Sequence, residues 1–235
     1  MTRSLRIDRP QVTEGVVAIP IRTPLVQRGD DLGALVHAAV TGIAQPGDVL
    51  AISETAVAIA QGESVRAEYV RPSRLALFLC RHAGPLATVS QPESLQLVID
   101  NVGPLKVIFA AVLNVLGTLI GKRGLFYQIM GSAITAIDGY TGTMPPFESA
   151  IVFAPQNPDA SAQSLFERTG IATAIVDAND LGKAQVLGAS ASVNSDFVAQ
   201  VLLSNPHGNG DEQTPIVVLK WRGVGRNLLH ASESG

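Results

Sequence analysis

The sequence has few of the residues that mark disulfide-rich, nucleic-acid-binding or disordered proteins. Cys80 is the single cysteine among 235 residues, so an internal disulfide is impossible and a reducing, cytoplasmic location is expected. Charged residues make up only 16% of the chain and its net charge is −3, so we expect no nucleic-acid partner. With 46% hydrophobic residues, the chain is not disordered and can bury a large core.

The apolar run VIFAAVLNVLGTLI, at residues 107–120, is too short for an ordinary transmembrane helix. As a helix it would reach about 21 Å, whereas the hydrocarbon core of a bilayer is about 30 Å thick. Asn114 and Gly117 further weaken the case for a membrane span. We therefore expect no membrane partner and predict a buried or interface helix, part of which a partner subunit could cover. A membrane-associated protein that uses this run is the alternative.

Apolar runs and helical spacings alternate along the chain. Strands are expected at residues 15–20, 132–137, 149–153, 171–176 and 215–219, and a further apolar run covers 49–59. Helices are predicted at 32–40 with Asp30 as N-cap, at 74–81, 91–100 and 193–202, and from 157 to a stop at Gly170. The alternation predicts an α/β or α+β fold. We expect one domain over residues 1–235, with an inserted helical segment at about 72–128.

Common catalytic motifs are missing from the sequence. GTLIGK, at residues 117–122, resembles a phosphate-binding loop but is one residue short and lacks the Ser or Thr that binds magnesium. We interpret it as the end of a helix. The four histidines lie far apart, without the spacing of a zinc site.

Two strands rich in small residues each end in an aspartate. SAITAID ends at Asp138 and IATAIVD ends at Asp177. If these strands are neighbours in one sheet, both carboxylates lie at one edge, where open sheets bind ligands. A hard divalent cation such as magnesium would then relieve their repulsion. The alternative is that both are turn-forming aspartates whose side chains bond locally.

Six segments resemble, in the same order, those of one enzyme family, over residues 19 to 219 or so. They are IPIRTPLVQRGDDLGALV, QPGDVLAISETAVAIAQGESV, AIDGY, APQNPDASAQSL, AIVDANDLG and VNSDFVAQVLLSNPHGNGDEQTPIVVL. No single segment is specific, but their common order over most of the chain indicates a common fold. The chain resembles the coenzyme F420-0:γ-glutamyl ligase family.

This resemblance implies a mixed α/β (α+β) fold with a mixed sheet, here with an unusually apolar helical insertion, and it implies a homodimer and GTP-dependent peptide synthesis. In that family GTP phosphorylates a carboxylate of a deazaflavin precursor, and the amine of L-glutamate then attacks the acyl phosphate to form a γ-linked amide. A divalent metal, Mg²⁺ or Mn²⁺, neutralises the phosphate oxygens. The implied partners are small molecules: the nucleotide, glutamate and the deazaflavin precursor.

The resemblance also assigns roles to residues of this chain. Asp138 and Asp177 fall on the family's metal-binding aspartates. The nucleotide-contacting positions fall on Thr23, Pro24, Leu25, Val26 and Glu54, and a later nucleotide segment falls on the loop at 205–211. No residue is assigned as a catalytic group, and the acceptor and the choice of GTP or ATP stay open.

Four departures from the family's pattern support a second function. Glu54 and Ile59 stand where the family has a serine and a lysine, although charged donors bind phosphate most strongly. Ala178 replaces the threonine that follows the second metal aspartate, and the apolar stretch at 105–126 has no counterpart. The alternative function is therefore a catalytically degenerate relative that binds a small molecule or a protein. Lys183 is either a replacement phosphate contact or an ordinary surface lysine.

Overall fold

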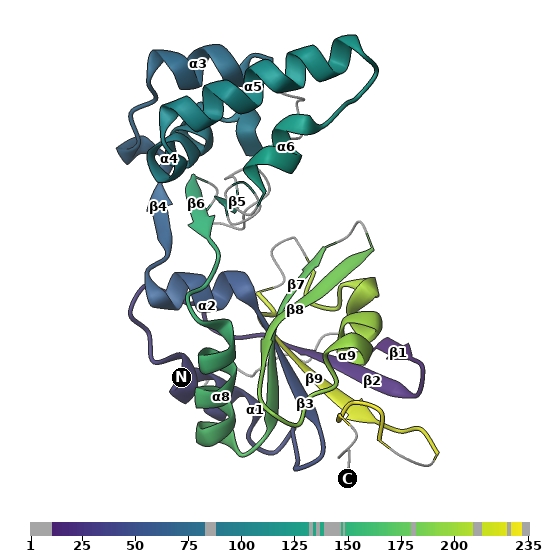
Figure 1. The fold of residues 1–235 in the computed structure, drawn as a ribbon. Coiled ribbons are helices and arrows are strands. Elements are labelled where there is room, and N and C mark those ends of the chain that lie inside the picture. The colour runs from purple at the N-terminus through teal and green to yellow at the C-terminus, as the bar shows by residue number, and fades with distance from the viewer. Residues whose placement is uncertain are drawn as a thin grey trace. The chain divides into compact units, whose positions relative to one another are not determined.

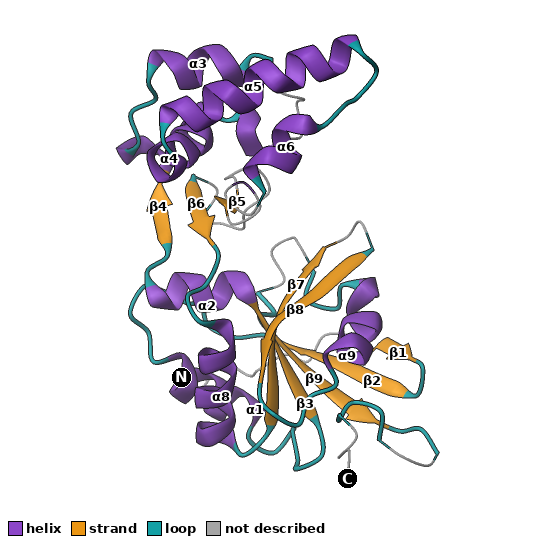
Figure 2. Ribbon diagram, in the orientation of Figure 1, coloured by secondary structure: helices purple, strands orange, loops and turns teal. Residues whose placement is uncertain are grey.

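The computed structural model describes residues 11–82, 88–131, 134, 137–138, 147, 149–179, 182–208, 213–224 and 227–231. It divides the chain into two compact units. The sheet unit comprises Met1–Glu63 and Pro155–Gly235, and the helical unit comprises Ser64–Ala154 (Figures 1 and 2). The segment expected at about 72–128 falls inside the helical unit, which interrupts the sheet unit in the sequence. A single domain for the whole chain stays a prediction.

The sheet unit is built on a six-stranded mixed sheet of order β1-β2-β9-β3-β7-β8. Its strands are β1 (Gln11–Thr13), β2 (Val16–Ile21), β3 (Val49–Ser53), β7 (Ala172–Asn179), β8 (Lys183–Ala189) and β9 (Ile216–Trp221). The pair β3 and β7 is parallel, and the other neighbouring pairs of this sheet are antiparallel. This arrangement confirms the mixed fold and the mixed sheet.

Helices cover both faces of this sheet (Figure 1). They are α1 (Leu32–Val40) and α8 (Pro158–Thr169) on one face and α9 (Ser195–Val201), followed by the turn η3 (Leu202–Ser204), on the other. Leu50 and Ile52 of β3 pack toward α1 and α8, whereas Val49 and Ala51 pack toward α9. Because the central strands are buried on both faces, they consist of continuous apolar residues, which made them visible in the sequence.

The helical unit combines a small antiparallel sheet with four helices among its described residues. The sheet order is β4-β6-β5, formed by β4 (Ser64–Arg66), β6 (Ala150–Phe153) and β5 (Ile137–Asp138). The helices are α3 (Arg74–Cys80), α4 (Pro92–Val102), α5 (Pro104–Leu119) and α6 (Leu125–Met130), with turns η1 (Ala67–Tyr69) and η2 (Thr88–Ser90). Leu95, Val98, Val107 and Ile151 lie in its separate hydrophobic core.

The apolar run at 107–120 forms most of α5, which turns back through a short loop into α6. A Cβ atom at Gly117 would lie 2.3 Å from Leu125 Cδ1 and 3.0 Å from the Lys122 carbonyl oxygen, so glycine leaves room for the Leu125 side chain and the loop between the two helices. The Asn114 side-chain oxygen accepts a hydrogen bond of 3.2 Å from the Phe126 N–H. The two residues that interrupt the apolar run therefore close the α5–α6 hairpin. The prediction that GTLIGK is a helix end is confirmed, because α5 stops at Leu119.

Among the described helices, none is long and apolar enough to cross a membrane alone. Only together do the helices α4 and α5, bent by 114° at their junction, have the length and apolar composition of a membrane span.

Three predicted details are wrong. The N-cap of α1 is Asp31, whose side chain accepts from the Ala34 N–H at 2.9 Å, whereas Asp30 accepts from the Gln27 N–H in the preceding turn. Of the strand predicted at 132–137, Ile134 is helical and β5 begins only at Ile137. The strand β7 continues to Asn179, so Asp177 lies within a strand and not at its end. It continues because β8, which we did not predict, pairs with it.

Gly188 of β8 lies against the first turn of α8. A Cβ atom there would be 2.3 Å from the Asp159 nitrogen and the Pro158 carbonyl carbon, which cannot move without shifting the helix. We expect Gly188→Ala to lower the free energy of unfolding by about 1–3 kcal/mol, as measured by urea denaturation. Gly33→Ala in α1 is the matched control. Its Cβ would meet only side-chain atoms, at 3.3 Å or more, so stability should stay within about 1 kcal/mol. Equal losses in both variants would contradict the packing argument.

Candidate functional site

Parts of four strands meet at one edge of the six-stranded sheet. Ile21, the last residue of β2, pairs with Ile216, the first residue of β9, and Ile52 of β3 pairs with the same residue. The Ser53 N–H then donates to the Pro215 carbonyl at 2.8 Å. Since β7 runs parallel to β3 with Ser53 opposite Val176, it reaches the same edge. Open sheets bind ligands at such carboxyl ends of strands.

We call this region the strand-end site and define it by Thr23, Glu54, Asp177, Thr214 and the segment 205–208. Thr23 follows β2, Glu54 follows β3, Asp177 lies in β7 and Thr214 precedes β9. The segment 205–208 is joined to Thr214 through His207. Most of the residues predicted from the sequence as nucleotide contacts therefore lie in one region.

The two predicted nucleotide segments are neighbours at this edge. Thr23 is buried, and its N–H donates to the Gln213 carbonyl at 3.0 Å, while its hydroxyl donates to the Pro24 carbonyl at 2.8 Å. Val26 is buried, Leu25 is half-buried and Pro24 is exposed. In the later loop, residues 209–212 lie outside the described part of the chain. The backbone contact at Thr23 nevertheless brings the first segment beside Gln213, two residues after the second segment.

Glu54 and Asp177 occupy matching positions on neighbouring elements. Glu54 is the first residue of α2 (Glu54–Gln61), directly after Ser53, and Asp177 directly follows the Val176 that pairs with Ser53. Asp177 is exposed, but the surrounding protein removes part of its hydration and raises the pKa of its carboxyl above the usual value. Two carboxylates in such positions are oxygen donors of the type that hard divalent cations prefer.

The hairpin formed by β7 and β8 places a lysine on the same face as Asp177. Asp177 pairs with Gln185, and Asn179 pairs with Lys183. Directly opposed residues of antiparallel strands share a face, and diagonal neighbours lie about 7–8 Å apart, within reach of a long side chain. Lys183 is exposed and lies at a position diagonal to Asp177 on the same face of the hairpin, within reach of its long side chain.

Asp138 does not lie in the same sheet as Asp177. It belongs to β5 and pairs with Val152 in the three-stranded sheet of the helical unit. The expectation that the two strands are sheet neighbours is therefore wrong, because residues 64–154 form a unit with its own sheet. The side chain of Asp138 is outside the described residues, so its shared metal role stays a prediction. Within the described residues, no group of three or more His, Cys, Asp or Glu could hold a metal.

The replacement residues differ in their surroundings. Ile59, at the position of the family's lysine, is buried in α2 and is 5% exposed. Ala178 is half-buried in β7, next to Asp177. Ile59 therefore contributes to packing, and Lys183 is a described cation at a position diagonal to Asp177.

Sequence reasoning missed a pair that holds the later loop together. His207 is buried and its Nδ1–H donates to the Thr214 carbonyl at 3.0 Å, while the Thr214 hydroxyl donates to the His207 carbonyl. Burial lowers the pKa of His207 to about 4, although the hydrogen bond to Thr214 acts in the opposite direction. The imidazole is therefore neutral at pH 7. A histidine and a threonine seven residues apart form no periodic pattern, and only their place around the loop before the last strand could have suggested the pair.

This neutral histidine makes stability depend on pH. Its pKa is about 4 in the folded protein and near 6.5 when unfolded, so between these values the unfolded chain binds more protons. Stability is complete above about pH 6.5 and falls as the pH drops toward 4. We expect a loss on the order of 1–3 kcal/mol across this window in chemical denaturation. His207→Gln should flatten this dependence, whereas His37→Gln, on the exposed side of α1, should leave it unchanged. The same slope in His207→Gln as in the wild type would rule the assignment out.

Comparison with known proteins identifies the family of the chain. The model of the family described as F420-0:Gamma-glutamyl ligase matches residues 20–178. The coenzyme F420:L-glutamate ligase of Methanosarcina acetivorans is 26% identical over 153 residues, which are 63% of this chain and 50% of that protein. The chain thus spans half the length of this curated relative.

The matched region begins just before Thr23 and ends just after Asp177. It contains the first predicted nucleotide segment, Glu54 and both predicted metal aspartates, whereas Lys183 and the loop at 205–208 lie beyond it. Since the match covers more than half of the sequence, the chain belongs to the F420-0:γ-glutamyl ligase family.

Proposed function

We propose that the protein is a GTP-dependent ligase that joins L-glutamate, through a γ-linked amide, to a carboxylate of the deazaflavin precursor of coenzyme F420. The observation that carries this proposal is the family match over residues 20–178, which includes Thr23, Glu54 and Asp177 of the strand-end site. The proposal includes a homodimer and a divalent metal, Mg²⁺ or Mn²⁺.

The proposed reaction has two steps. A carboxylate oxygen of the acceptor attacks the γ-phosphorus of GTP, the bond to the β-phosphate oxygen breaks, and an acyl phosphate and GDP result. The amine of glutamate then attacks the acyl carbon, the carbon–oxygen bond to phosphate breaks, and the amine loses a proton. Catalysis of phosphoryl transfer depends mainly on positioning and on neutralising negative charge.

The residues of the strand-end site suit these tasks. Asp177 and Glu54 offer carboxylate oxygens on neighbouring elements, a donor set that fits a hard divalent cation. A bound metal would supply neutralisation of the phosphate oxygens. Lys183, on the same face as Asp177, would contact a phosphate oxygen. The paired hydrogen bonds of His207 and Thr214 would hold the nucleotide loop at the start of β9.

Asp177→Asn tests the metal role of the site. The amide keeps the size of the side chain but removes the charge, so we expect glutamate incorporation to fall at least about 100-fold. The rise in melting temperature that GTP and Mn²⁺ give the wild type should also disappear. Asp196→Asn, at an exposed acid in α9, is the matched control and should behave as wild type. A wild-type protein whose melting temperature is unchanged by GTP with either metal would contradict the proposal.

Lys183→Gln tests the phosphate contact. Loss of one exposed charge should weaken GTP binding about 5- to 10-fold, measured by isothermal titration calorimetry in the presence of Mn²⁺. Lys122→Gln, at an exposed lysine of the helical unit, should leave the affinity unchanged. An unchanged affinity in Lys183→Gln would make this residue an ordinary surface lysine.

The burial of Ile59 favours a second candidate function, a catalytically degenerate relative that binds a small molecule or a protein. A phosphate-binding lysine is absent at that position, and Ala178 cannot supply a hydroxyl. A wild-type protein that binds GTP with Mn²⁺ but forms no amide would support this second function over the ligase.

A further inference from the structure

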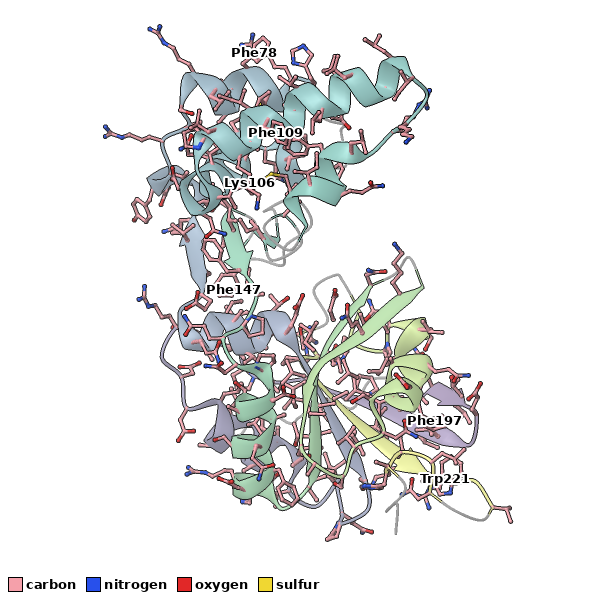
Figure 3. The ribbon with its side chains drawn as sticks, in the orientation of Figure 1. Phe78, Lys106, Phe109, Phe147, Phe197 and Trp221 are labelled. Atoms are coloured by element: carbon pink, nitrogen blue, oxygen red, sulfur yellow. The ribbon has the colours of Figure 1, made fainter. Side chains whose placement is uncertain are left out.

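One face of α5 is apolar and exposed to solvent. Its opposite face, with Val107, Ala110 and Gly117, is buried in the helical unit. The exposed face, which we call the α5 stripe, consists of Leu105, Ile108, Phe109, Val112, Val115, Leu116 and Leu119, with exposed fractions from 41% at Ile108 to 81% at Leu105. Figure 3 labels Phe109 on this helix, together with Lys106.

The α5 stripe is larger than the apolar patches of most monomers. Because a fully exposed large side chain offers roughly 150–250 Å², the partly exposed members of the stripe present on the order of 800 Å². Monomeric proteins rarely expose contiguous apolar patches above about 300–600 Å², and larger ones mark a contact surface for a protein or a membrane. The polar groups and the charges around the stripe distinguish these two occupants.

The stripe offers no side chain that forms hydrogen bonds. The two polar side chains near it are used within the helical unit: the Thr118 hydroxyl donates to the Asn114 carbonyl at 2.7 Å, and the Asn114 side-chain oxygen accepts from the Phe126 N–H. A protein interface carries about one hydrogen bond per 100–200 Å², so an interface of this area would contain roughly four to eight. Acyl chains need none, and the backbone groups of a helix are bonded within the helix. The stripe therefore suits lipid better than protein.

The charged residues beside the stripe are all basic. Lys106 lies in the first turn of α5, Lys122 and Arg123 follow its end, and all three are exposed. Residues 101–137 contain no aspartate or glutamate. The acid that precedes them, Asp100, belongs to α4, before the bend of 114° between the two helices. The stripe thus has basic residues at both ends, which attract an anionic surface.

A second copy of the chain does not complement these charges. Two stripes in contact would gather the cations of both copies around one apolar patch, without an acid of residues 101–137 to pair with them. A homodimer shared with the family would not use α5 either, because the stretch at 105–126 has no counterpart there. The net charge of −3 for the whole chain does not oppose an anionic surface, since salt screens charges beyond about 8–10 Å.

The shape of the helical unit suits a helix that lies in the plane of a bilayer surface. Such a helix buries its apolar face about 5–10 Å into the boundary between headgroups and acyl chains, and it needs no particular length. Flanking lysine and arginine side chains run along the apolar surface while their charged ends stay in water. The neighbouring helix α4 buries Leu95, Val98 and Ile99 in the core of the unit, so its apolar face is not available to complete a span.

We propose that the α5 stripe is a contact surface for an anionic lipid bilayer, with α5 in the plane of the membrane and Lys106, Lys122 and Arg123 among the headgroups. The inference goes beyond the proposed function. It also revises the expectation of no membrane partner, which considered the length of a span. It uses no residue of the strand-end site, so its failure and the failure of the ligase chemistry are measured separately.

Flotation of the full chain with vesicles tests the apolar contact. The wild type should float with vesicles of equal parts phosphatidylglycerol and phosphatidylcholine. Val112→Glu places a charge at the centre of the stripe and should lower the partition coefficient at least about 50-fold, because a carboxylate resists transfer to the acyl boundary. Thr118→Glu adds the same charge to α5 outside the stripe and should lower it at most about fivefold, the effect of one charge near an anionic surface.

Replacement of the flanking cations tests the electrostatic contribution. Because each cation near an anionic surface contributes about fivefold, Lys122→Gln should lower the partition coefficient about fivefold. The triple variant Lys106→Gln, Lys122→Gln, Arg123→Gln should lower it about 100-fold. Arg222→Gln, at an exposed cation of the sheet unit, is the matched control and should bind as the wild type does. Binding of the wild type should weaken as salt is raised from about 50 to 500 mM.

A fluorescent label provides a second test that does not depend on a charged variant. In a Cys80→Ser background, Val112→Cys labelled with nitrobenzoxadiazole should brighten when the mixed vesicles are added, and Thr118→Cys should not. A wild type that does not float, equal flotation with phosphatidylcholine alone, a Val112→Glu that floats as the wild type does, or equal brightening at both labels would overturn the proposal. A lipid-independent oligomer that Val112→Glu abolishes would also overturn it and assign the stripe to a protein contact.

Discussion

The parallel pairing of β3 with β7 is the contact on which the arrangement of the sheet unit depends. Both strands are buried on both faces between α1 and α8 on one side and α9 on the other, so their paired length is mostly apolar, with Thr173 and Ser53 as its polar residues. Because the strands run in the same direction, the acidic residues that follow Ser53 and Val176 come at the same edge. The backbone register therefore places Glu54 and Asp177 at that edge.

The sequence predicted the elements whose pattern is local. The buried strands appear as apolar runs, and α8 runs up to Gly170, whose positive φ of 72° ends it as expected. The strand β8 was missed because it lies at the edge of the sheet and alternates polar with small residues, and its presence moved Asp177 into a strand interior. The sequence alone could not separate Asp138 from Asp177, since each follows a similar run and only the long-range pairing assigns them to different sheets.

The candidate site was predicted only in part, because several of its contacts join distant parts of the chain. The resemblance placed Thr23 and the later loop in nucleotide binding, and the backbone bond from Thr23 to Gln213 makes them neighbours. The pair of His207 and Thr214 was not found, because its hydrogen bonds join residues on the two sides of a loop. The sequence alone did not show where Lys183 lies. The register of β7 with β8 places it diagonally opposite Asp177.

The interruption of the sheet unit by residues 64–154 has a consequence for biosynthesis. Ser53 and Val176 are partners in the central strand pair, yet 123 residues separate them, so β3 leaves the ribosome long before β7 exists. The contacts among α3, α4, α5 and α6 join nearby parts of the chain and form without waiting for distant segments. We infer that the inserted helices form first and bring the two ends of the insert close together. The loop that must close before β3 can pair with β7 is then effectively shorter.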